Sequence, residues 1–132
     1  MAPPKLIAVN DAGVEFQLLT PFFEAILPAF ESKADEIRVE PHRSGLRVTC
    51  CDEGLVVPLP RSPRNYAAMA FPRILILAKM SIALEGAEQS GSFRLRYDDR
   101  FIAVHVLGRR DPDKWVLTFR PVWDQAEPVV RD

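Results

Sequence analysis

The chain has 132 residues, of which 48% are hydrophobic and 27% are charged, and its formal net charge is −1. This length and composition fit one globular domain with its own core and exclude a disordered chain. Seventeen basic residues balance eighteen acidic ones, so neither nucleic acid nor an anionic membrane surface is an expected partner.

Targeting and redox signals are sparse. The first residues contain no long apolar stretch typical of a signal peptide, and no run approaches the ~18 apolar residues of a membrane-spanning helix. The two cysteines, Cys50 and Cys51, are adjacent, and a strand would point them to opposite faces, which argues against a mutual disulfide. We therefore expect a reduced, cytoplasmic setting. Two Cys and two His cannot form a standard zinc cluster, and we expect no metal and no cofactor.

The first third of the chain predicts a strand or hairpin around "NDAG" in residues 5–18, followed by a helix. Thr20 is a candidate cap and Pro21 suits the first helical position. Pro28 is expected to kink or interrupt this helix. Apolar residues recur at helical spacing and predict its buried face: Phe22, Phe23, Ile26, Leu27 and Phe30.

Residues 35–55 predict a β-hairpin. Ile37 and Val39 alternate with charged residues before the turn "PHRSG", and Leu46, Val48 and Cys50 alternate with polar residues after it. The sequence "LVVPLP" is expected to lead away from the second strand.

The second half predicts a helix and then strands. Ser62 and Pro63 can begin a helix through "RNYAAMAFPRILILAKMSIA", which either bends at Pro72 or divides there. Strands follow at 93–97, 101–107 and 115–122, with a tight turn at "DDR" and a polar loop at 108–114. The strand "FIAVHVL" is expected to be apolar on both faces.

This order of elements predicts an α+β fold with a mainly antiparallel sheet of about five to six strands, flanked by two or three helices. Residues 1–122 are expected to form one domain, and 123–132 a flexible tail.

A family resemblance covers about residues 34–120. The segments "ADEIRVEP", "GLRVTCCDEGLV", "PRILILAKMSIALEGAEQSGSFRL", "DRFIAVHVL" and "DKWVLTFR" occur in this order. Together they resemble the domain that precedes the motor in the ATPases of type II secretion and type IV pilus assembly in bacteria. The resemblance implies a PAS-like module that packs against a RecA-type motor within a hexameric ring.

The chain departs from this family in its phosphate chemistry. It contains no G-x-x-x-x-G-K-[ST] loop, whose backbone and lysine would hold phosphates, so we expect a module that stands without the ATPase domain. The resemblance implies three arginines that reach a bound nucleotide, and the matching positions here hold Gly86, Ser92 and His105. Gln89 and Gly91 of the same stretch remain, as does Arg100, so we expect the turn geometry to be kept while the phosphate contacts are lost.

Five residues are candidates for an interaction site. Arg38, Arg43 and Arg47 lie on the polar side or the turn of the hairpin and could bind a phosphate or an acidic partner. The alternative is a solvated face shared with Glu40, Asp52 and Glu53. Arg100 is a further candidate, and Trp123 could pack on the edge of the domain or on a partner.

Two other residues could carry chemistry. His105 is either a ligand or acid–base group or, in the favoured interpretation, an ordinary sheet residue. Cys50 is expected in the core, and Cys51 would be a reactive thiol only if Arg38 lay beside it.

The sequence thus predicts no catalytic residues and a module that is not an enzyme. Its leading function is protein interaction or scaffolding, with a secretion or pilus ATPase or a second copy of itself as partner. The alternative is a PAS-like small-molecule sensor, and an enzyme of unrelated chemistry is the third candidate.

Overall fold

A seven-stranded antiparallel sheet and two α-helices make up the part of the protein that the computed structural model describes. This part comprises residues 6–10, 12–43, 45–50, 53–59, 66–80, 88–111 and 114–128. The elements in chain order are β1 (Leu6–Val9), the 3₁₀ turn η1 (Gln17–Leu19), α1 (Thr20–Glu31), β2 (Ile37–His42), β3 (Gly45–Cys50), β4 (Glu53–Pro58), α2 (Tyr66–Leu77), β5 (Glu88–Tyr97), β6 (Arg100–Asp111) and β7 (Lys114–Pro128).

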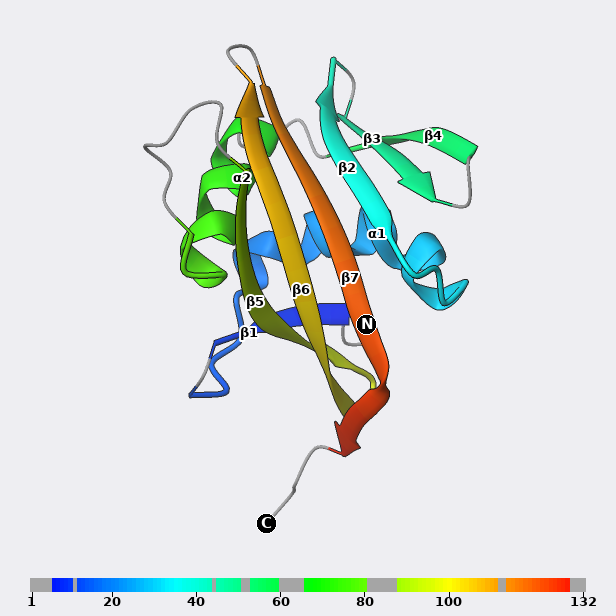
Figure 1. Ribbon diagram of the computed structural model, residues 1–132, viewed down its shortest axis with the longest axis vertical. Helices are drawn as coiled ribbons and strands as arrows, with labels where there is room; N and C mark the ends of the chain where they lie inside the picture. Colours follow the sequence, from blue (N-terminus) through cyan, green and yellow to red (C-terminus); the bar gives the residue numbers. More distant parts are fainter. Residues whose placement is uncertain are drawn as a thin grey trace.

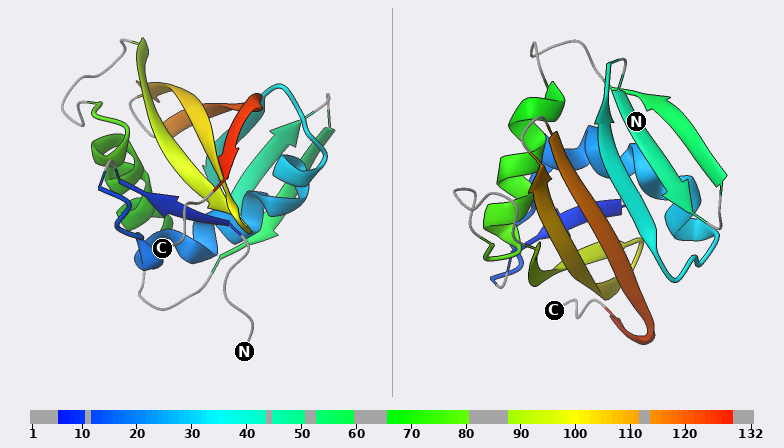
Figure 2. Two further views of the ribbon diagram at one scale, coloured as in Figure 1. Left: turned by 90° about the horizontal axis from the view of Figure 1, so that it is seen from below. Right: turned by 45° about the horizontal axis from the view of Figure 1, so that its top comes forward.

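The sheet has the strand order β1-β5-β6-β7-β2-β3-β4 (Figure 1). Two hairpin units, β5-β6-β7 and β2-β3-β4, meet where Arg38 of β2 pairs with Thr118 of β7. The sheet curls around the two helices, which lie on its concave side (Figure 2). The α+β class with a mainly antiparallel sheet is therefore confirmed, while the number of strands exceeds the predicted five to six.

The additional strand is β4, whose sequence predicts a segment that leads away from the hairpin. Its residues pair with β3 along the whole strand, from Cys50 opposite Glu53 to Gly45 opposite Pro58. Pro58 is tolerated because it ends an edge strand, where its missing N–H group leaves no ladder bond unmade.

Aromatic rings form the centre of the core between α1 and the sheet. Phe22 is fully buried and makes edge contacts with Phe71 of α2 and Phe119 of β7, at ring-centroid distances of 5.5 and 6.2 Å. Phe23 packs on Phe93 of β5 at 5.7 Å. The apolar spacing of the first helix correctly predicted four residues of its buried face, because Phe22, Phe23, Ile26 and Phe30 are at most 1% exposed. The fifth predicted residue, Leu27, is only partly buried.

Both predicted helices continue through their internal prolines. Helix α1 includes Pro28, so the expected interruption there does not occur, and α2 includes Pro72, so of the two alternatives at Pro72 the division is wrong. Thr20 is not a side-chain cap either. The helix begins at Thr20 itself, whose N–H donates to the Gln17 carbonyl of η1, so the preceding 3₁₀ turn takes the place of a capping side chain. Ser62 and Pro63 lie outside the described residues.

The long strands extend beyond their predicted ends. The expected loop at 108–114 is wrong, because β6 runs to Asp111 and β7 begins at Lys114, with those two residues paired. Strand β7 also continues past residue 122, and its backbone pairs again with β6 where Phe101 lies opposite Glu127. The predicted tail is thus a strand as far as Pro128, and residues 129–132 lie outside the described part.

Two expectations about β5 and β6 are also wrong. Gln89 and Gly91 lie within strand β5 rather than in a turn. Gly91 allows the end of α2 to approach, because a Cβ at this position would lie 2.1 Å from the Ala78 carbonyl oxygen. Strand β6 is not buried on both faces: Val104 and Val106 are buried, but His105 between them is exposed.

Candidate interaction surfaces

The convex face of the sheet brings together Ser92 and His105, two of the three positions for which the resemblance implies an arginine. Ser92 of β5 lies directly opposite His105 of β6, and His105 lies opposite Arg120 of β7. All three are exposed. Gly86, the third such position, lies outside the described residues. A serine and a histidine thus occupy neighbouring surface sites that the resemblance assigns to arginine.

Arginines on this face are paired with carboxylates. Arg120 contacts Glu36, with its Nε 2.8 Å and its Nη2 2.6 Å from the Glu36 Oε1 atom. Arg96 forms an ion pair with Glu15. Such exposed pairs contribute little to stability, but they lower the positive charge that a phosphate would meet.

The predicted hairpin arginines are only partly brought together. Arg38 and Arg47 share the convex face with Glu40, which pairs with Arg38 at 3.0 Å and lies opposite Arg47 across the two strands. Arg43 is exposed in the turn between β2 and β3. The described part of this cluster has mixed charge.

Arg100 and Trp123 lie apart from that cluster. Arg100 begins β6 and is exposed. Trp123 packs on the protein itself, with its ring centroid 4.5 Å from that of Phe30 and 6.0 Å from that of Tyr97. The Lys33 Nζ atom lies 5.4 Å from the same indole. Trp123 therefore follows the prediction of packing at the edge of the domain.

The remaining candidates for chemistry are isolated within the described ranges. His105 lies on the open face, Cys50 is half-buried against the core rather than within it, and Cys51 is not described. Among the described residues, no three His, Cys, Asp or Glu side chains gather in a way that could hold a metal ion. No described helix is long and apolar enough to cross a membrane.

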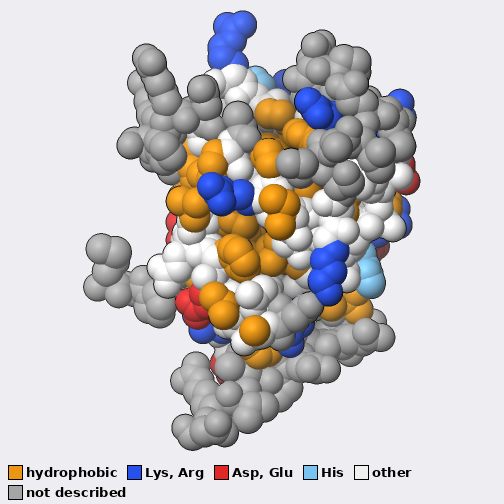
Figure 3. All heavy atoms as spheres, turned by 90° about the vertical axis from the view of Figure 1, so that its left-hand side faces the viewer, with side chains coloured by type: hydrophobic (Ala, Val, Ile, Leu, Met, Phe, Trp, Pro, Cys, Tyr) orange, Lys and Arg blue, Asp and Glu red, His pale blue; other side chains and the backbone are white. Residues whose placement is uncertain are grey.

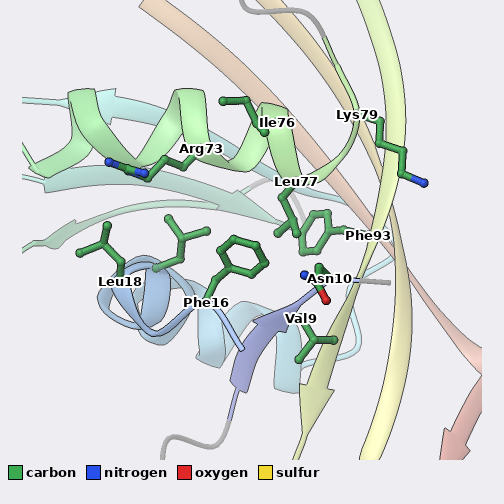
Figure 4. A pocket seen from close by; sticks show the side chains of 10 residues that line it. Val9, Asn10, Phe16, Leu18, Arg73, Ile76, Leu77, Lys79 and Phe93 are labelled. Carbon is green, nitrogen blue, oxygen red and sulfur yellow. The ribbon is translucent and has the colours of Figure 1, made fainter. Parts of the chain in front are cut away.

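A groove between α2 and η1, the turn in the segment that follows β1, was not predicted from the sequence. Its volume is about 290 Å³. Phe93 of β5 and Leu77 of α2 lie at its inner end, and Phe16 and Leu18 form the wall opposite α2 (Figure 4). The described residues that line it are Val9, Asn10, Phe16, Leu18, Leu19, Arg73, Ile76, Leu77, Lys79 and Phe93.

Apolar side chains remain exposed along this groove. Ile76 is 63% exposed and Leu18 is 48% exposed, although their chain neighbours Leu75 and Leu19 are at most 1% exposed. On this side of the molecule, hydrophobic side chains gather over the centre of the face, with Lys and Arg side chains around them (Figure 3). Sequence periodicity could have indicated only Ile76, since the groove draws residues from four separate parts of the chain.

Comparison with known proteins relates this architecture to one component of a secretion apparatus. No family model matches the chain. A protein of Xanthomonas campestris pv. campestris is 29% identical over 99 residues, and one of Klebsiella pneumoniae is 30% identical over 78 residues. Both are named type II secretion system protein E, as is a protein of Pectobacterium carotovorum subsp. carotovorum that is 31% identical over 78 residues. This chain is similar to a part of type II secretion system protein E.

The similarity to type II secretion system protein E confirms the resemblance predicted from the ordered sequence segments. The matches cover 75% of this chain for the Xanthomonas protein and 59% for the other two. They cover only 18% and 16% of those proteins themselves, so the chain spans less than a fifth of the length of the curated relatives it matches.

Proposed function

We propose that this chain is a non-catalytic interaction module of a bacterial secretion or pilus-assembly apparatus. It acts in the cytoplasm by docking on a protein, which is a secretion or pilus ATPase or a second copy of the chain. The similarity to type II secretion system protein E supports the setting, and the convex face of the sheet supports the non-catalytic role.

The observation that carries this proposal is the position of Ser92, which lies directly opposite His105 on the exposed face of the neighbouring strand. Arginine suits a polyphosphate because its charge is permanent and its planar fork forms two hydrogen bonds at once. Serine has no charge, and the histidine ring lacks the forked set of five N–H donors of arginine. A surface with these residues, beside an Arg120 already paired with Glu36, favours contact with a protein over contact with a nucleotide.

The proposal is tested by isolating the tagged chain from its native cell at its natural level, under mild conditions, and measuring the mass of the complex. We expect a defined complex with an ATPase or a second copy, and no phosphate release when the purified chain is given Mg²⁺ and ATP. Recovery of the free monomer alone would argue against an interaction module. ATP turnover by the purified chain would argue against a non-catalytic one.

A small-molecule sensor is the second candidate, and the groove between α2 and η1 is the observation that favours it. Ligand sites are typically concave and mostly apolar with a few polar groups, as this groove is. A ligand present at about 100 times its dissociation constant would raise the free energy of unfolding by ~2.7 kcal/mol. A thermal-shift screen of nucleotides and metabolites tests this function, and a screen without shifts would leave it unsupported.

A further inference from the structure

We propose that the groove between α2 and η1 binds an amphipathic helix of a partner protein, with acidic residues beside the apolar stripe of that helix. This inference rests on the proposed interaction function and adds to it the surface and the chemical class of the partner. Three features support it: the extent of the apolar surface, the charge of the lining residues, and the backbone pairing of β1 at the side of the groove.

The apolar surface extends beyond the cavity. Phe16, Leu77 and Phe93 form its interior, while Leu18 and Ile76 on the two walls keep about half or more of their surface exposed. A molecule small enough to fill about 290 Å³ would leave these two side chains in water. A helix lying along the groove would cover them, because its residues i, i+3 or i+4, and i+7 span about 10 Å on one face.

The charges of the lining favour an acidic partner. Among the lining residues that the structure describes, Arg73 and Lys79 are cationic and none is acidic. They lie on opposite sides of the apolar side chains (Figure 4). The Arg73 Nε donates to the Met69 sulfur at 3.0 Å, which is a weak acceptor. A carboxylate beside an apolar stripe would therefore meet the Arg73 guanidinium at one end of the groove.

Backbone pairing argues against a partner that adds a strand to β1. Strand β1 is at the edge of the sheet, but Val9 already forms a bridge with Glu15, and the Phe16 N–H donates to the Ala8 carbonyl at 2.9 Å. The backbone on the groove side of β1 is thus occupied by the chain itself. Strand addition needs free N–H and C=O groups, whereas a helix needs only the side-chain surface.

The inference can be tested with the full chain and two synthetic helical peptides. Both carry leucines at helical spacing; one has glutamates beside the leucines, and the other has lysines there. We expect the glutamate peptide to bind and to shift the NMR signals of Ile76, Leu77 and Phe93. We expect Arg73→Glu to weaken its binding about fivefold and Ile76→Asp to weaken it by about tenfold or more.

Leu55→Asp is the matched control, because Leu55 is 67% exposed and belongs to β4, at the other edge of the sheet. This variant should bind the glutamate peptide as the unaltered chain does, and circular dichroism should show all variants folded. Equal binding of the two peptides would overturn the inference, as would unchanged binding by Ile76→Asp. Saturable binding of decanoate without binding of either peptide would also overturn it, in favour of a small ligand.

The complex isolated from the native cell separates this inference from the proposed function. Loss of that complex with Ile76→Asp, but not with Leu55→Asp, supports the groove as its docking surface. A complex that survives Ile76→Asp would overturn the groove proposal and leave the interaction function standing. Absence of a complex with the unaltered chain would instead contradict the interaction function itself.

Discussion

Tyr66 connects helix α2 to the 3₁₀ turn η1 through a hydrogen bond from its hydroxyl group. Its side chain is buried in the core, and its hydroxyl donates to the Leu18 carbonyl of η1 at 2.7 Å. Burial raises the pKa of this hydroxyl above its usual value of 10.0, because the low-dielectric surroundings disfavour the phenolate. Tyr66 thereby holds the start of α2 beside the turn that forms one wall of the groove.

Replacing Tyr66 with Phe should make stability less sensitive to alkaline pH. At neutral pH we expect Tyr66→Phe to lower the free energy of unfolding by about 1 kcal/mol, through loss of the hydrogen bond. Above pH 10 the unfolded tyrosine loses its proton before the folded one, so the unaltered protein loses stability that the variant keeps. Urea denaturation should show that the free energies of unfolding of the variant and of the unaltered protein differ less at pH 10.5 than at pH 7. A constant difference would contradict the raised pKa.

At the scale of elements, ring contacts rather than local sequence signals set the end of β7. The sequence after Pro121 contains polar residues and a further proline, which predicted a flexible tail. In the structure, Trp123 lies against Phe30 of α1 and Tyr97 of β5. Such aromatic contacts add to the free energy gained from burial alone, and they hold the strand against the sheet beyond its predicted end.

Replacing Trp123 with Ala should therefore destabilise the whole domain. We expect a loss of about 2–3 kcal/mol in the free energy of unfolding, less than for a fully buried tryptophan because Trp123 is half-buried. Arg120→Ala on the same strand is the control, with an expected loss of at most about 1 kcal/mol from its exposed ion pair with Glu36. Chemical denaturation measures both. A change within about 0.5 kcal/mol for Trp123→Ala would indicate a frayed end instead.

Across the whole molecule, the two ends of the described chain meet in one sheet. Strand β1 pairs with β5, β5 pairs with β6, and β6 pairs with β7. Although β1 is an edge strand, all four of its residues are at most 2% exposed. The sheet is complete only when the first strand joins strands formed from the last third of the chain, so β1 is part of the common core.

Deleting residues 1–9 should abolish cooperative folding. Burial of Leu6, Ile7 and Val9 contributes roughly 5–9 kcal/mol, which is comparable with the total stability of about 5–15 kcal/mol of a typical domain. Thermal unfolding followed by circular dichroism should show no sharp transition in the truncated chain. The exposed substitution Val14→Ser, just after β1, should leave the transition nearly unchanged. A truncated chain that unfolds at the original midpoint would contradict a core role for β1.

The sequence by itself determined the α+β class, the hairpin of β2 and β3, the buried face of α1 and the relation to type II secretion system protein E. These follow from period-2 and helical spacing of apolar residues and from the order of short segments, all of which are local or linear signals. The mixed-charge surface around Arg38 and Glu40 was also foreseen, since alternation places both on one side of a strand.

The addition of β4 to the hairpin unit, the length of β7, the exposed face of β6 and the groove could be seen only in the tertiary structure. Each depends on residues far apart in the chain: β4 gains its ladder from β3, Trp123 gains its contacts from Phe30, and the groove joins α2 to the segment after β1. Neither propensity nor periodicity reports such contacts, because the free energy that fixes them comes from burial between segments that the sequence keeps separate.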